Sequence, residues 1–402
     1  MSLPMSEPDY ERGGVRLYCG DCLDVLPTLE ADIFTACVCD SPYELGFMGK
    51  AWDSTGVAFR PETWAAVSRV MKPGAMLLAF GGTRTFHRLA CAIEDAGWEI
   101  RDTIMWVYGS GFPKSLDVSK AIDKAAGVAR DKISGGRGPG WQRSIGNIRP
   151  WMEEEDHQID GPLPATPLAA KFNGYGTALK PAWEPIILAR KPLDGTVAQN
   201  VQKWGTGALN IDGCRIGTEN TLRIQGEAEM GYHGGNHAPG QATGHSSGRF
   251  PANLCHDGSD EVLEGFPETS GGGKPQQRDR APSAVHFISD RRLEYEPYAD
   301  TFNGGGSAAR FFYTAKASKS ERGPGNNHPT VKPLALMRYL CRLVTPPEGG
   351  LILDLFMGSG TTALAAVEEG NAFVGVELEK DSFDIAVARI DAELDQLRLP
   401  GM

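Results

Sequence analysis

The sequence predicts an α/β protein with a wound, mostly parallel β-sheet that is interrupted by a long, loop-rich insertion. Short apolar runs alternate with amphipathic helical segments near both ends of the 402-residue chain. Near the carboxyl terminus, the turn Gly358-Ser-Gly360 opens a predicted helix. From about residue 110 to about residue 310 the periodicity is lost and glycine clusters recur. We therefore expect two sheet-forming halves on either side of the insertion.

The composition is that of a soluble globular protein, with 41% hydrophobic and 23% charged residues. No apolar run is long enough to span a membrane, and the first residues lack a basic and apolar leader pattern, so we expect a cytoplasmic protein. The eight cysteines are scattered, several of them within apolar runs, as expected of reduced thiols. Cys37 and Cys39 alternate within a predicted strand, which argues against a zinc site formed with Cys19 and Cys22, and no metal is predicted.

The first half predicts alternating strands and helices. The run from Ile33 to Cys39 is β-branched or small and lacks glycine and proline, which is typical of a buried parallel strand. Pro61 opens a helix, which the segment Lys72-Pro-Gly74 ends. The predicted strands lie at 15–20, 33–39, 75–80, 98–100 and 103–107, and the predicted helices at 61–71 and 85–96.

The segment Asp40-Ser41-Pro42-Tyr43 directly follows the strand at 33–39. Ligands bind at the carboxyl ends of strands in an open α/β sheet. Pro42 has no backbone donor, the Ser41 carbonyl can face a ligand, and Tyr43 offers a flat ring. These groups suit an extruded nucleobase with an exocyclic amino group. The alternative is an ordinary turn in which Asp40 bonds to its own backbone.

The second half predicts helices at 334–344, 363–370 and 382–397 and strands at 351–356 and 372–377. The glycine turn and the acid Glu377 would also fit a nicotinamide dinucleotide site. However, Asp354 would repel a pyrophosphate and attract an α-ammonium group, which favours S-adenosylmethionine. We therefore expect the strand that carries Asp40 to lie beside the strand that carries Asp354.

The insertion is more basic than the whole chain, whose net charge is -11. A locally basic face can bind phosphate groups whatever the total charge. Lys114, Arg137 and Arg143 are candidates for such contacts.

Three motifs together resemble the permuted β-group of DNA amino-methyltransferases. They are Asp40-Ser-Pro-Tyr43, His328-Pro-Thr-Val-Lys-Pro333 and Asp354-Leu-Phe-Met-Gly-Ser-Gly-Thr361, in this order. The resemblance implies a circularly permuted Rossmann-like methyltransferase sheet with a long target-recognition insertion. It divides the chain into a catalytic half at 15–110, a DNA-binding insertion at 111–310 and a cofactor-binding half at 311–397. It also implies double-stranded DNA as the substrate, S-adenosylmethionine as the cofactor and restriction-modification as the setting, and it leaves open whether the chain forms a homodimer.

The same resemblance assigns roles to individual residues. Asp40 and the Ser41 carbonyl would accept hydrogen bonds from the target amino group, Pro42 would shape the turn, and Tyr43 would stack on the flipped base. The implied cofactor-binding residues are Asp21 at the adenine, Glu377 at the ribose, Asp354 at the methionine amino group, Asp40, Thr330, Lys332 and Pro333 near the methionine end, and Phe356, Gly358, Ser359, Gly360 and Thr361 in the glycine loop.

Ser41 departs from the family pattern, which is Asp-Pro-Pro-Tyr for adenine N6 and Ser-Pro-Pro-Tyr for cytosine N4. The change keeps the carbonyl but loses the rigidity of proline. The leading Asp40 favours adenine N6, with cytosine N4 as the alternative. Asn-Pro-Pro-Tyr enzymes that methylate protein glutamine are disfavoured by Asp40 and by the insertion. A DNA-binding relative without catalysis stays an alternative because of Ser41.

Overall fold

The computed structural model describes residues 7–46, 51–111, 115–134, 158–161, 163–216, 248–269, 306–315 and 331–397. The chain divides into two compact units, one formed by residues 1–109 and 183–402 and the other by residues 110–182. Among the described helices, none combines the length and the apolar character needed to cross a membrane.

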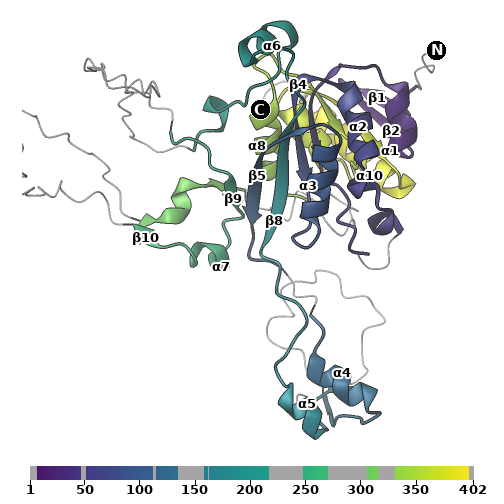
Figure 1. The fold of residues 1–402 in the computed structure, drawn as a ribbon, viewed down its shortest axis with the longest axis vertical. Helices are drawn as coiled ribbons and strands as arrows, with labels where there is room; N and C mark the ends of the chain where they lie inside the picture. The colour runs from purple at the N-terminus through teal and green to yellow at the C-terminus, as the bar shows by residue number, and fades with distance from the viewer. Residues whose placement is uncertain are drawn as a thin grey trace, which may run out of the picture. The chain divides into compact units, whose positions relative to one another are not determined.

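A ten-stranded sheet forms the centre of the first unit (Figure 1). The strands in spatial order are β1 (Tyr10–Arg12), β2 (Val15–Cys19), β14 (Ala372–Glu377), β13 (Leu351–Asp354), β3 (Phe34–Cys39), β4 (Met71–Phe80), β8 (Trp183–Arg190), β5 (Glu99–Val107), β9 (Leu254–His256) and β12 (Tyr313–Thr314). The five consecutive strands β2, β14, β13, β3 and β4 are parallel to one another. β8 is antiparallel to both β4 and β5, so β5 runs in the same direction as β4. This arrangement confirms the predicted α/β class.

The strand that ends at Asp40 lies beside the strand that carries Asp354, as predicted. β3 and β13 are parallel, and Ile352 is paired with Ala36 and Leu353 with Cys37. The next strand in the chain after β13 lies on one side of this pair, and the next strand after β3 lies on the other. The pair is therefore the point where the winding of the sheet reverses, which is where open α/β sheets bind ligands.

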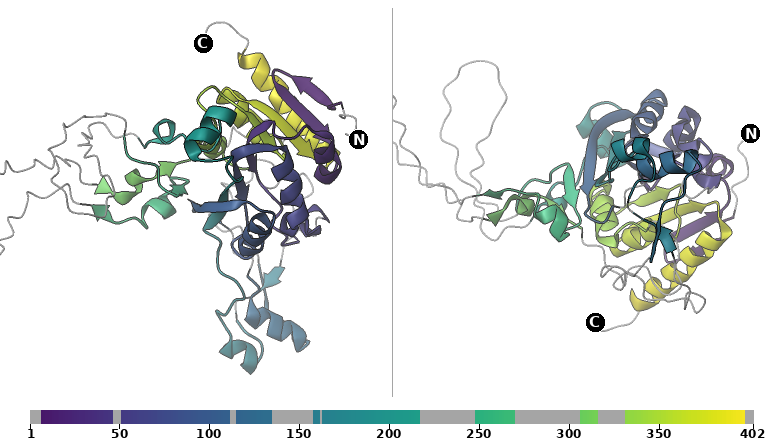
Figure 2. Two further views of the ribbon diagram at one scale, coloured as in Figure 1. Left: turned by 45° about the horizontal axis from the view of Figure 1, so that its top comes forward. Right: turned by 90° about the horizontal axis from the view of Figure 1, so that it is seen from below.

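Helices cover both faces of the sheet (Figures 1 and 2). α1 (Cys22–Val25), α2 (Pro61–Val70) and α3 (Phe86–Asp95) pack on one face, and α8 (Leu334–Val344), α9 (Thr361–Glu368) and α10 (Lys380–Leu397) pack on the other. Because strand side chains alternate between faces, Ala36 and Val38 join the core under α8 to α10, whereas Cys37 and Cys39 join the core under α1 to α3. β3 is buried on both faces, as its sequence predicts.

The boundaries of two predicted elements differ from the structure. β4 begins at Met71, so the predicted stop at 72–74 lies within the strand. The two strands predicted at 98–100 and 103–107 form one strand, β5, with a register shift between Ile100 and Asp102. Met71 of β4 pairs with Phe34 of β3, and pairing with β8 continues through both segments of β5. These are long-range contacts that local sequence does not show.

Part of the predicted insertion belongs to the sheet unit. Beside β8 and β9, this part contains α6 (Val197–Trp204), η7 (Asp212–Cys214), α7 (Asp260–Leu263), the paired strands β10 (Glu268–Thr269) and β11 (Gly306–Ser307), and most of η8 (Ala308–Phe311). The separate unit is limited to residues 110–182. The chain permutation and the role of residues 111–310 in target recognition stay predictions.

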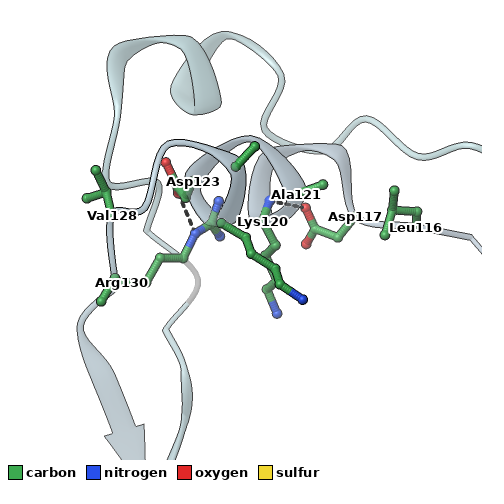
Figure 3. A pocket seen from close by; sticks show the side chains of 10 residues that line it. Leu116, Asp117, Lys120, Ala121, Asp123, Val128 and Arg130 are labelled. Atoms are coloured by element: carbon green, nitrogen blue, oxygen red, sulfur yellow. Dashed lines mark hydrogen bonds and ion pairs between the residues drawn. The ribbon is translucent and has the colours of Figure 1, made fainter.

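The second unit contains α4 (Val118–Ala125), α5 (Pro167–Lys171) and the paired strands β6 (Lys132–Ser134) and β7 (Gln158–Asp160). Its buried Asp123 accepts hydrogen bonds from the Arg130 Nε at 2.7 Å and from the Ala165 and Thr166 amides at 3.0 Å. Burial opposes the charge of Asp123, but these hydrogen bonds lower its pKa to about 2. Figure 3 shows the Asp123–Arg130 pair in the lining of a cavity on α4. Lys114, Arg137 and Arg143 lie outside the described residues.

Candidate active site

Four of the predicted acids follow neighbouring parallel strands at one edge of the sheet. Asp21 follows β2, Glu377 ends β14, Asp354 ends β13 and Asp40 follows β3. The ends of β2 and β14 are joined directly, because the Gly20 amide donates a hydrogen bond to the Glu377 carbonyl at 2.9 Å. The structure therefore places the predicted acids in one row.

The glycine loop connects β13 to α9 and packs closely on α10. Gly358 and Gly360 have φ values of 54° and 81°, which favour glycine. A Cβ at Gly360 would lie 2.9 Å from the Ala386 Cβ, so a larger residue would collide with α10. The Glu377 carboxylate accepts a hydrogen bond from the Gly358 amide at 2.7 Å. Glu377 thus fixes the loop, in addition to its predicted role at a ribose.

The other polar loop side chains hold the loop to α10. Ser359 and Thr361 are buried, and the hydroxyl of each accepts a hydrogen bond from Arg389 at 3.1 Å. Phe356 is half-buried beside the loop. Direct contacts of these side chains with a cofactor stay predictions.

Asp354 is a buried carboxyl group with a perturbed pKa. It is 1% exposed, and its Oδ1 accepts a hydrogen bond from the Phe356 amide at 2.9 Å. Burial raises its pKa to about 7, and the charges of Asp40 and Glu377 act in the same direction, against the hydrogen bonds from Thr362 and Phe356. A cation bound at this carboxyl would stabilise its charged form.

Asp40 forms an ion pair with Lys332, which lies 292 positions away in the sequence. The Lys332 Nζ lies 2.7 Å from the Asp40 Oδ2 and about 5 Å from the ring centres of Phe80 and Tyr43. Burial alone would lower the pKa of Lys332, but the charges of Asp40 and Glu184 outweigh it and raise this pKa. The structure thus joins two of the motifs that were identified separately in the sequence. Pro333 follows Lys332 and caps α8, whereas Thr330 lies outside the described residues.

The turn after Asp40 is held by side-chain hydrogen bonds. The Ser41 hydroxyl is buried and donates to the Phe80 carbonyl at the end of β4 at 2.5 Å. The Thr85 hydroxyl donates to the Tyr43 carbonyl at 2.9 Å, and Pro42 is buried between the two anchored residues. Ser41 therefore provides by hydrogen bonding part of the constraint that a proline would provide covalently.

The sequence analysis did not identify Glu184 as a site residue. Its Oε2 accepts a hydrogen bond from the Tyr43 hydroxyl at 2.9 Å and lies 3.3 Å from the Lys332 Nζ. Glu184 is near the amino end of β8, and β8 is antiparallel to β4, so this end lies at the same edge as the carboxyl ends of the parallel strands. The rule that sites lie at the carboxyl ends of strands therefore does not point to Glu184. The available signal was a lone acid beside the apolar run at 185–189.

The charges of the site are predominantly negative. Asp40, Asp354, Glu377 and Glu184 lie near one edge of the sheet, and Lys332 is shared between two of them. Such a site favours a small ligand with positive charges over a pyrophosphate. The dinucleotide alternative, against which the sequence offered only the charge of Asp354, is therefore disfavoured by the charge of the whole site.

Sequence comparisons support the same interpretation. Residues 266–388 match a family model for N6/N4 methyltransferases that is described as DNA methylase. The type II methyltransferase M.ScaI of Streptomyces caespitosus is 42% identical over 83 residues, which are 21% of this chain and 26% of that protein. M2.DpnII of Streptococcus pneumoniae is 36% identical over 88 residues, which are 22% of this chain and 32% of that protein. These alignments span about a third or less of each relative's length. They confirm the predicted resemblance to DNA amino-methyltransferases.

Among solved structures, the cytosine-N4-specific PvuII DNA methyltransferase aligns with a TM-score of 0.44 and 12% sequence identity, covering 97% of this chain and 95% of the other. The complex of M1.HpyAVI with SAM aligns with a TM-score of 0.40 and 15% identity, covering 94% of this chain and 99% of the other.

Proposed function

We propose that this chain transfers the methyl group of S-adenosylmethionine to the exocyclic N6 amino group of adenine in double-stranded DNA, after flipping the base out of the helix. The observation that carries this proposal is the position of Asp40. It follows β3, beside the β13 strand and the glycine loop, and Lys332 is paired with only one of its oxygens. The similarity of residues 266–388 to DNA methylases supports the same reaction class.

The residues at the edge of the sheet fit S-adenosylmethionine. This cofactor has an α-ammonium group and a sulfonium, and it supplies an activated methyl group when bound. The Asp354 carboxyl is buried with two hydrogen-bond donors and no cation among its described partners, so an ammonium group would complete its environment. Glu377, which already holds the Gly358 amide, stands at the end of the next strand, where a ribose hydroxyl can bind.

The groups around Asp40 would orient the target base. Lys332 pairs with one oxygen of the Asp40 carboxylate, and this carboxylate would accept a hydrogen bond from the amino group. The Ser41 carbonyl is a second acceptor, and together they would direct the nitrogen lone pair toward the methyl group. Tyr43, whose hydroxyl is fixed by Glu184, offers its ring for stacking. Catalysis on this account is positioning in a preorganised electrostatic site.

The choice of base is the finer part of the proposal. The acidic first residue of the Asp40 motif favours adenine. The two acceptors, the Asp40 carboxylate and the Ser41 carbonyl, would however also fit the amino group of cytosine. We propose that residues 111–310 recognise the target sequence and that the enzyme acts on DNA in the cytoplasm, as part of a restriction-modification system.

The test is incubation with isotopically labelled S-adenosylmethionine and unmethylated genomic DNA, followed by digestion to nucleosides and mass spectrometry. We expect the label in N6-methyladenine. Label in N4-methylcytosine would keep the reaction class and overturn the base assignment. Cofactor binding without any transfer would instead favour the DNA-binding relative.

A further inference from the structure

We propose that Glu184 is a positioning residue of the methyl-transfer site, which acts by holding Tyr43 and Lys332 against the Asp40 motif. This inference rests on the proposed function and extends it to a residue outside the recognised motifs. Glu184 contacts neither of the reacting groups in this account, and it acts through its two partners.

The strand geometry brings Glu184 to this place. In the antiparallel pair of β5 and β8, Glu184 is directly opposite Trp106. Residues at alternate positions share a face, so Glu184 lies on the same face as Ile186 and Leu188, which join the core under α8. Asp40 lies on this face too, because Val38 belongs to the same core. Lys332 lies two residues before the start of α8, and its ammonium group contacts both carboxylates.

A single carboxylate oxygen has two partners. The Oε2 of Glu184 accepts from the Tyr43 hydroxyl at 2.9 Å and pairs with the Lys332 Nζ at 3.3 Å. The side chains of Glu184 and Lys332 are 18% and 8% exposed, so water screens this pair only weakly. Lys332 is thereby held between two carboxylates, and the Tyr43 ring is tied at its hydroxyl end.

Glu184 keeps Lys332 and Tyr43 in place before the target base binds. Without Glu184, the Lys332 ammonium could move fully onto Asp40 and occupy both of its oxygens, which would block the acceptor that the target amino group needs. The Tyr43 ring would also lose the hydrogen bond that fixes its hydroxyl. A small displacement of this kind lowers the rate much more than it lowers binding.

Glu184 also lies close in the sequence to the boundary between the two units. It is the second residue of β8, and β8 begins directly after residues 110–182, while the half-buried Tyr108 precedes that unit. Burial raises the pKa of Tyr108 to about 12, and the charge of Glu184 acts in the same direction, although the charge of Lys332 opposes it. The positioning network thus occupies both points where the chain leaves the sheet for this unit and returns to it.

The experiment compares Glu184→Gln and Glu184→Ala with a matched control, Glu99→Gln. Glu99 lies at the opposite end of the same strand pair and forms an ion pair with Arg190 at 2.6 Å, so the control removes an ion pair from β5 and β8 without touching the site. We expect kcat for DNA methylation to fall about 10-fold in Glu184→Gln and about 100-fold in Glu184→Ala. The KM for DNA and the Kd for S-adenosylmethionine should stay within about threefold of the wild type.

A double-mutant cycle shows whether Glu184 acts through its partner. The Tyr43→Phe variant removes the hydroxyl and keeps the ring. If Glu184 works through this hydroxyl, Tyr43→Phe should lower kcat clearly in the wild-type background and much less in the Glu184→Ala background. A merely structural role of Glu184 predicts additive effects.

The outcomes separate the two proposals. If the wild-type chain transfers methyl groups and Glu184→Ala has the kcat of Glu99→Gln, or if the cycle is additive, the inference about Glu184 is overturned and the proposed function stands. A wild-type chain that binds the cofactor and transfers no methyl group to DNA overturns the proposed function, and the inference with it.

Discussion

At the scale of single residues, the structure shows what constrains the backbone at Ser41, where the family pattern has a proline. Proline at this position would fix the backbone through its ring. The Ser41 hydroxyl instead ties the turn to the Phe80 carbonyl, and both groups are buried. The turn after β3 is therefore linked to the end of β4. Sequence could show the loss of the ring but not its replacement, because the partner lies 39 positions away.

The Asp354 carboxyl predicts a pH dependence of cofactor binding. Burial raises its pKa to about 7, so it is protonated in much of the population below pH 7 and ionised above it. Only the ionised form attracts an ammonium group, and we expect the Kd for S-adenosylmethionine to rise up to about tenfold for each unit of pH below 7 and to level off above it. Isothermal titration calorimetry between pH 5.5 and 8.5 measures this dependence.

The variant Asp354→Asn should bind the cofactor weakly and without this slope, because its side chain does not titrate. Retention of the full slope in Asp354→Asn would contradict the assignment and would point to another carboxyl such as Glu377, whose pKa burial also raises.

At the scale of elements, the rule that sites lie at the carboxyl ends of parallel strands selected Asp21, Asp40, Asp354 and Glu377, which the structure places at one edge of the sheet, while their roles stay predictions. These positions follow from local patterns, since an apolar run that stops at an acid is visible in the sequence. The same rule missed Glu184, because β8 is antiparallel and presents its amino end at this edge. Strand direction depends on long-range pairing and could not be predicted from the run at 185–189.

The glycine loop gives a prediction with a control inside the chain. Gly360 and Gly370 both have positive φ values, 81° and 77°. A Cβ at Gly370 would meet nothing within 4 Å, whereas a Cβ at Gly360 would press on Ala386 in α10. Gly370→Ala should therefore lose about 1 kcal/mol of unfolding free energy from backbone strain alone. Gly360→Ala should lose about 1–3 kcal/mol more from overpacking and should weaken cofactor binding.

Urea unfolding of both variants, together with cofactor titration, measures these effects. Equal losses of stability in the two variants would show that the loop does not depend on its close approach to α10.

At the scale of the whole molecule, the strands and helices of the two outer halves could be predicted, because their hydrophobic periodicity is strong. Those of the middle part could not. Residues 183–190 lie within the part predicted as an insertion, yet they form a central strand of the sheet. Their apolar run is visible in the sequence, but its partners, in β4 and β5, are at least 76 positions away. The separate unit is limited to residues 110–182.

This division predicts that residues 110–182 can be removed. Val107 and Trp183 are paired across β5 and β8, so a linker of about four glycine and serine residues after Gly109 can close the two strands as a hairpin. We expect the shortened chain to fold and to bind S-adenosylmethionine with a Kd within about threefold of the wild type, because the predicted cofactor-binding residues all lie in the sheet unit. It should lose methylation of DNA.

Cofactor titration and a methylation assay on the same preparation test this expectation. Sequence-specific methylation by the shortened chain would contradict a role of residues 110–182 in target recognition.

The most direct test of the central claim is the transfer activity of Asp40→Ala and Asp40→Asn, measured with labelled S-adenosylmethionine beside the control Asp32→Asn. Asp32 also pairs with a lysine, Lys191 at 2.8 Å, but it precedes β3 and so lies at the opposite edge of the sheet. We predict that both Asp40 variants lose at least about 100-fold in kcat while the Kd for the cofactor changes less than about threefold, and that Asp32→Asn keeps full activity. Full activity in either Asp40 variant would contradict the account, because methyl transfer in it depends on the Asp40 carboxylate as acceptor.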